Sequence, residues 1–171
     1  MVSDATRRMA WNEYLDVERA ARYYDKLSRQ YRRRHNAVMV GLALCAIAGA
    51  GRFMFSDYIG RLAEVIVDLG IIAVSVFGLL GNHARKSASL HAVSVLCFDL
   101  QDKHKALWSK IENNVIGNDE AYNTLMDLIE AGERATSIPG WADISVNDKL
   151  NRQSQREADD SLVDQYSIKE A

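Results

Sequence analysis

The sequence predicts an all-α protein organised around a two-span transmembrane helical hairpin. Three observations lead to this fold class. Two apolar runs, residues 37–51 and 62–81, follow each other closely; a basic cluster lies outside each run; and the other apolar residues repeat at three- and four-residue spacings. The first run contains no charged residue, whereas the second carries Glu64 and Asp68.

The lengths of the two runs fit a bilayer. A helix rises about 1.5 Å per residue, so a hydrocarbon core of roughly 30 Å needs about 20 apolar residues. The second run has 20 residues, and the first reaches this length only if the helix continues past Arg52, whose charged head can snorkel to the interface. The alternative is a hairpin buried inside a soluble helical bundle.

Basic residues next to the two runs predict the topology. They are Arg32, Arg33, Arg34, Arg85 and Lys86. An excess of Lys and Arg marks the cytoplasmic side of a membrane protein, so we expect both termini in the cytoplasm. A nucleic-acid interface is the alternative for such a cluster, but no base-stacking or base-reading pattern accompanies it, and we predict no nucleic-acid partner.

The remaining chain is expected to be helical, in four segments: an amphipathic helix in 1–36, the hairpin 37–82, a helical region 83–136, and an acidic helix or tail 137–171. One helix is predicted over 7–34. Its apolar stripe packs either against a neighbouring helix or on lipid, and its acidic residues favour packing. The stripe consists of Trp11, Tyr14, Leu15, Ala21, Tyr24, Leu27 and Tyr31.

After Asn82 the helix is expected to continue to about residue 116, with its own buried stripe. That stripe consists of Leu90, Val93, Cys97, Leu100, His104, Leu107, Trp108 and Ile111. Gly117 then ends the helix and Asn118 caps the next one, whose predicted buried face contains Tyr122, Leu125, Met126 and Ile129. After a break at Pro139, a polar helix over 146–166 either docks on a neighbour or is partly disordered.

The charges are distributed unevenly. Residues 1–36 contain nine Lys and Arg against five Asp and Glu, whereas residues 118–171 contain five against twelve. The basic head and the acidic tail either attract each other or are separately solvated, and we favour a solvated tail.

Inside the hairpin, small residues predict close helix packing and polar residues predict a pore. Gly41, Cys45 and Gly49 form a small-residue ridge of the kind that lets helices approach in lipid. The candidate pore-lining residues of the second run are Glu64, Asp68, Ser75 and Asn82. A carboxylate in a span costs on the order of 3 kcal/mol, so Asp68 either contributes to a carboxylate ring in an oligomeric pore or pairs with Arg52 or Arg61 within the hairpin.

The sequence contains no pattern typical of an enzyme. It has no phosphate-binding glycine loop, no nucleophile elbow, no HExxH motif and no Cys/His spacing for zinc. We therefore predict no catalytic activity, no metal site and no cofactor.

Two features of the chain resemble a known family. Trp11 and Tyr14 lie ahead of the first run, and the segment 84–111 contains His91, Phe98, Leu100, His104, Leu107 and Trp108. Over roughly residues 7–136, this order of features resembles the SLATT family. These are two-transmembrane effectors associated with nucleotidyltransferase and SLOG sensor systems. The resemblance implies an anti-phage effector that oligomerises in the bacterial inner membrane and perforates or depolarises it, under control of a nucleotide second messenger or a sensor protein. The alternative function is a non-conducting anchor that recruits a soluble partner through its cytoplasmic helices.

Overall fold

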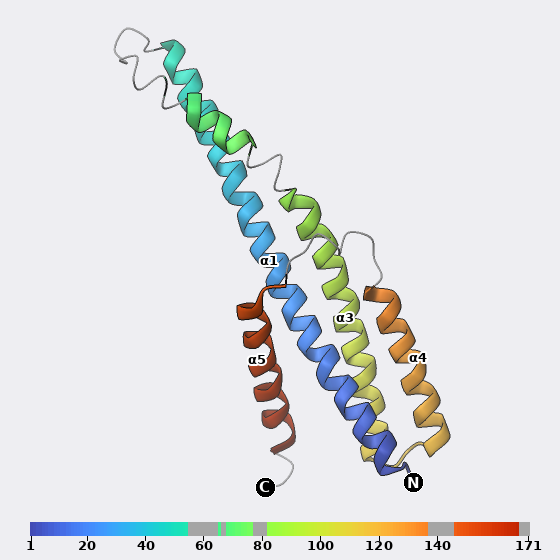
Figure 1. Ribbon diagram of the computed structural model, residues 1–171. Helices are drawn as coiled ribbons and strands as arrows, with labels where there is room; N and C mark the ends of the chain where they lie inside the picture. Colours follow the sequence, from blue (N-terminus) through green and yellow to red (C-terminus); the bar gives the residue numbers. More distant parts are fainter. Residues whose placement is uncertain (55–64, 66–67, 77–81, 137–145, 168–171) are drawn as a thin grey trace. The chain divides into compact units, whose positions relative to one another are not determined.

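The computed structural model describes residues 1–54, 65, 68–76, 82–136 and 146–167 (Figure 1). Every element in these ranges is an α-helix, which confirms the predicted all-α class. The elements are α1 (Asp4–Met54), a helical segment over 68–76, α3 (His83–Glu112), α4 (Asn118–Thr136) and α5 (Asp148–Ser167). The chain forms two compact units: unit 1 contains Met1–Ser28 and Ala88–Ala171, and unit 2 contains Arg29–Ser87.

Helix α1 is one element of 51 residues that belongs to both units. Ser3 caps it by accepting a hydrogen bond on Oγ from the Thr6 amide at 3.2 Å. The predicted helix end near residue 34 is wrong, because α1 passes through the basic cluster and continues to Met54. Arginine is a good helix former and the cluster contains neither proline nor glycine, so nothing in it interrupts the helix.

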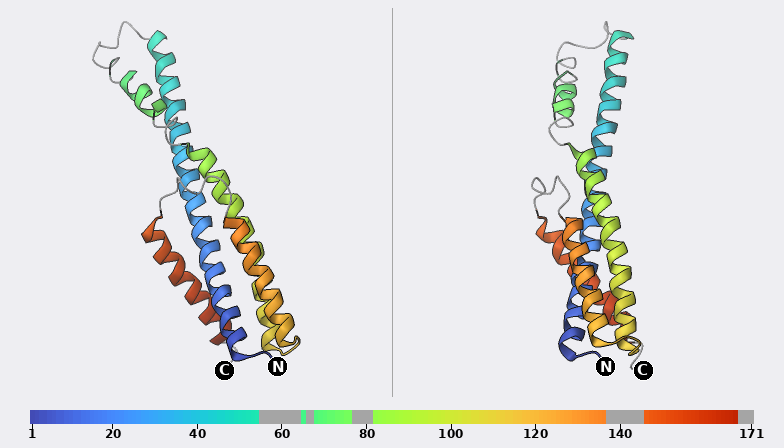
Figure 2. Two further views of the ribbon diagram at one scale, coloured as in Figure 1. Left: turned by 45° about the vertical axis from the view of Figure 1, so that its right-hand side comes forward. Right: turned by 90° about the vertical axis from the view of Figure 1, so that its right-hand side faces the viewer.

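The first part of α1 lies between α5 and α3, and α4 runs beside α3 (Figures 1 and 2). One apolar cluster joins α1, α3 and α4, with Ala10, Leu107, Ile111 and Leu125 among its buried members. Further along α1, Ala21 packs with residues of α3 in a second cluster that also includes Tyr24, Val93 and Cys97. The aromatic stripe of α1 therefore packs within the protein, as predicted.

The α3–α4 corner is closed by Asn114. This residue has φ 52°, and the Val115 amide donates to the Lys110 carbonyl at 2.9 Å while the Asn114 amide donates to the Ile111 carbonyl at 3.1 Å. This is a Schellman closure, which ends α3 before the predicted boundary at Gly117.

The start of α4 is tied to the start of α1. The side chain of Asn118 does not cap its own helix, because its Oδ1 accepts hydrogen bonds from the Ser3 amide at 2.9 Å and from Thr6 Oγ1 at 3.1 Å. The predicted burial of Tyr122 is also wrong: its side chain is 45% exposed, whereas Ala121 and Leu125 are fully buried.

Helix α5 docks on α1. Asn147 caps α5 through Oδ1, which accepts a hydrogen bond from the Leu150 amide at 3.2 Å, and its own amide donates to Tyr23 Oη at 3.0 Å. Among the described side chains, two ion pairs join the helices: Arg19 with Asp159 at 2.8 Å and Lys26 with Glu157 at 2.6 Å. The preference for a solvated acidic tail is therefore wrong, because acidic residues of α5 pair with the basic head.

Unit 2 contains the second part of α1 beside the helical segment 68–76 (Figure 2). The two approach closely at Gly41, where an added Cβ would lie 3.3 Å from Val74 Cγ1. The expected continuous helix through Asn82 is wrong, because Asn82 has φ 41° and its carbonyl accepts a hydrogen bond from the Lys86 amide as α3 begins. Among the described residues, no helix has both the length and the apolar composition needed to cross a membrane.

Candidate functional site

In the described part of unit 2, residues 38–48, 65 and 68–76 expose many apolar side chains. Val38 and Gly41 lie on the side of α1 that packs, with Val38 only 9% exposed. The other sides of both helices present large apolar side chains that are 47–68% exposed: Met39, Val40, Leu44, Ile47, Val65, Leu69, Ile72 and Val76. Contiguous apolar surface of this kind is typical of a membrane or protein contact.

The structure describes three of the four predicted pore-lining residues. Asp68 is exposed beside Leu69, and Ser75 on the same helical segment is half-buried. Asn82 is exposed and lies directly before α3, with φ 41°. Glu64 lies outside the described residues. The structure therefore leaves Asp68 and Ser75 as the two candidates on one helical segment.

The predicted packing residues lie on α1. Gly41 makes the close approach to Val74 described above, and Cys45, one turn later, is half-buried. The helix includes Gly49, although the surroundings of this glycine lie outside what the structure describes. Sequence reasoning identified Gly41 but could not identify Val74, because residue pairing across a hairpin depends on the length and shape of its turn.

The basic cluster is larger than predicted. Arg32, Arg33, Arg34 and Arg85 are exposed and Lys86 is half-buried. The Arg34 guanidinium lies 5.6 Å from the centroid of the Tyr31 ring, and the same ring lies 5.8 Å from the His83 imidazole. Burial, and then the charges of Arg34, Lys86 and His35, lower the pKa of His83. In the sequence, only the position of His83 just ahead of Arg85 indicated that this histidine belongs with the basic cluster.

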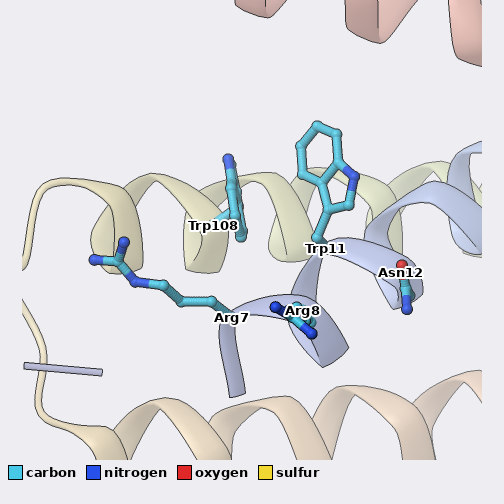
Figure 3. Close-up of a pocket in the computed structure, with 5 residues that line it drawn as sticks. All are labelled: Arg7, Arg8, Trp11, Asn12 and Trp108. Carbon is cyan, nitrogen blue, oxygen red and sulfur yellow. The ribbon is translucent and has the colours of Figure 1, made fainter. Parts of the chain in front are cut away.

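Unit 1 contains an open aromatic hollow of about 500 Å³. Trp11 and Trp108 line it with ring centroids 4.9 Å apart, and Figure 3 shows both indoles standing on the same side of their helices. Arg7 and Arg8 lie at its edge. Arg7 extends away from the indoles, and its Nη2 donates to Asn114 Oδ1 at 3.1 Å. Sequence reasoning assigned each tryptophan to a packed stripe but did not predict their contact.

Burial favours the neutral forms of Cys97 and His104 in unit 1. Burial raises the pKa of Cys97 to about 11 and lowers the pKa of His104. Within the described ranges, no group of three or more His, Cys, Asp or Glu residues could hold a metal ion. The reactive groups described by the structure are therefore dispersed.

Known proteins give no assignment for this arrangement. No family model, no curated protein and no solved structure matches the chain.

Proposed function

We propose that this chain is a homo-oligomeric membrane effector of the SLATT type. In this proposal unit 2 lies in the bacterial inner membrane with both termini in the cytoplasm, and the assembled hairpins perforate or depolarise that membrane. The observation that carries the proposal is the apolar exterior of the described part of unit 2, where eight large apolar side chains are exposed.

The size of this apolar surface supports a non-aqueous surrounding. Burying a large apolar side chain contributes about 1.5–3 kcal/mol, so covering eight that are roughly half exposed would contribute on the order of 6–12 kcal/mol. This is comparable with the whole stability of a typical domain, about 5–15 kcal/mol. We therefore expect an apolar environment to cover these side chains and to contribute this free energy. Lipid is such an environment, because it covers both helices at once.

The charges next to the apolar surface support the same orientation. Arg32, Arg33 and Arg34 precede it on α1, and Arg85 and Lys86 follow it on α3. Such a charge distribution holds the adjacent ends of the hairpin on the cytoplasmic side.

Asp68 is the residue that tests conduction. Its carboxylate is exposed beside apolar neighbours, and a pore that it lines would select cations over anions. We expect liposomes containing the full chain to leak ions, and Asp68→Asn to lower the cation-to-anion permeability ratio. Asp102→Asn is the matched control, since Asp102 is an exposed carboxylate of α3 in unit 1. Unchanged selectivity in Asp68→Asn would remove Asp68 from the conducting path.

Membrane location is tested separately. Alkaline carbonate leaves integral membrane proteins in the membrane fraction and releases peripheral ones. Release of the chain from bacterial membranes without detergent would contradict the proposal as a whole.

A second candidate function is a non-conducting anchor that recruits a soluble partner. The hollow beside Trp11 and Trp108 favours it, because paired indoles with arginines nearby are typical of protein interfaces. Expression in bacteria distinguishes the two functions: a conducting effector depolarises the membrane and arrests growth, whereas an anchor is tolerated.

Control by a nucleotide second messenger or a sensor protein rests on the family resemblance, and leakage measured with and without added nucleotides tests it.

A further inference from the structure

A groove of about 470 Å³ runs between the second part of α1 and the helical segment 68–76. This volume lies within the range of about 300–1,000 Å³ that is common for small-ligand sites. Apolar and small side chains form its lining, together with one cation; the lining residues are Arg34, Ala37, Val38, Gly41, Ala73 and Val74. The shape and polarity of the groove therefore match a hydrocarbon chain joined to an anionic group.

Positive charge is concentrated near one end of this groove. The Arg34 guanidinium lines the groove and also lies over the Tyr31 ring, at 5.6 Å from its centroid. The same ring contacts His83, and the charged groups that lower the pKa of His83 are the cations Arg34, Lys86 and His35. Arg34 thus joins an otherwise apolar groove to a group of charges that also acts on His83.

We infer that this groove binds one anionic phospholipid, with an acyl chain against Gly41, Ala73 and Val74 and the phosphate at Arg34. The inference rests on the proposed function, because it requires unit 2 to lie in a bilayer. Basic pockets beside helices at the cytoplasmic side of a membrane are suited to anionic head groups. A second copy of the chain is a poorer occupant, since its own Arg34 cluster would bring like charge toward the same end.

Lipid retention by the full chain tests the inference. The protein is reconstituted in nanodiscs that contain equal amounts of phosphatidylglycerol and phosphatidylcholine, then transferred to mild detergent, and the lipids still bound are identified by native mass spectrometry. We expect phosphatidylglycerol to be retained in preference to phosphatidylcholine. Arg34→Gln should lower its retention about fivefold, the factor that corresponds to about 1 kcal/mol per basic residue near an anionic surface.

Matched variants distinguish binding in the groove from a general effect of charge or side-chain size. Arg33→Gln removes the same charge from an exposed neighbour that does not line the groove, so retention should fall less than in Arg34→Gln. Ala73→Leu fills the groove and should abolish retention, whereas Ala43→Leu adds the same atoms at an exposed position of α1 that does not line the groove.

Several outcomes would overturn the inference. Equal retention of both lipids, equal losses in Arg34→Gln and Arg33→Gln, or full retention in Ala73→Leu would each do so. A changed ladder of cross-linked multimers in Ala73→Leu with unchanged lipid retention would identify a second copy as the occupant instead. Carbonate extraction of the same variants keeps the two proposals apart: a chain that stays in the membrane without retained lipid contradicts only the groove, and a chain that is released contradicts the proposed function.

Discussion

Substitution of Gly41 by leucine is expected to open the hairpin of unit 2. A Cβ at this position would lie 3.3 Å from Val74 Cγ1 and 3.7 Å from Val74 Cγ2, so a leucine there displaces the Val74 side chain and pushes the two helices apart at this contact. Overpacking of this kind typically costs about 1–3 kcal/mol.

Gly70→Leu is the matched control, since a Cβ at Gly70 meets nothing within 4 Å. Replacing a helical glycine there should gain up to about 1 kcal/mol of helix propensity. Gly41→Leu gains the same propensity, so only the overpacking separates the two variants: they should differ by about 1–3 kcal/mol in the closed-to-open equilibrium, a population ratio of roughly fivefold or more.

The two cysteines provide the assay. Cys45 lies one turn beyond Gly41 and is half-buried, so opening the hairpin should speed its alkylation by N-ethylmaleimide in detergent micelles. Cys97 is an internal reference, because burial raises its pKa to about 11 and keeps its reactive thiolate scarce. We expect Cys45 to be alkylated faster in Gly41→Leu than in the wild type and no faster in Gly70→Leu, as measured for each site by mass spectrometry.

Equal alkylation of Cys45 in the two leucine variants would refute the packing of Gly41 against Val74. Faster alkylation of Cys97 in Gly41→Leu would also count against the reasoning, since it would indicate that unit 1 loosens together with the hairpin.

Three further predictions concern unit 1. The Ser154 side chain is fully buried, and its hydroxyl has no hydrogen-bond partner in the part of the chain that the structure describes; Ser154→Ala should therefore stabilise α5 by about 1 kcal/mol and slow its amide exchange about fivefold, unlike Ser161→Ala. Burial lowers the pKa of His104, so unit 1 keeps its full stability above the ordinary histidine pKa of about 6.5 and loses stability as the pH falls below it; thermal unfolding at pH 7.5 and 5.5 should show this loss, and His104→Gln should reduce it. The hydrogen bond from Lys26 lowers the pKa of Glu157, so this pair stabilises α5 above pH of about 4.3 and is lost on further acidification; at pH 7, Glu157→Gln should speed amide exchange in α5 by less than about fivefold, as a partly exposed pair contributes roughly 0.2–1 kcal/mol.

Residue spacing predicted much of the fold. The stripe from Leu90 to Ile111 is buried because three- and four-residue spacing places these side chains on one face of α3. The same reasoning was right for Leu125 but failed for Tyr122, since several registers of an amphipathic helix are nearly equivalent and Ala121 is buried in place of Tyr122.

The helix boundaries were harder to predict than the helices. The basic cluster around Arg33 was interpreted as a helix end, although arginine continues a helix without cost. Asn82 and Asn114 both adopt positive φ, and asparagine tolerates this conformation without requiring it, so composition alone did not identify these breaks.

Sequence reasoning recovered part of the candidate site. It identified Gly41 and the basic cluster from composition and position. It did not identify the groove, and it did not predict that Tyr31 and His83 lie within the basic cluster. Both depend on which residues of separate helices face each other. The contact between Trp11 and Trp108 was missed for the same reason.

The docking of α5 makes one part of unit 1 sensitive to ionic strength. Among the described side chains of α5, the buried ones are Ser154, Ala158 and Leu162; the apolar contact that they make is small, and the ion pairs Arg19–Asp159 and Lys26–Glu157 add to the attachment. The Debye length shortens from about 10 Å at 0.1 M salt to about 3 Å at 1 M, which screens exposed pairs but leaves buried apolar contacts in place. Concentrated salt should thus detach α5 by local unfolding before it disrupts the α1–α3–α4 core, and the detached helix would leave Arg19 and Lys26 open to other anions.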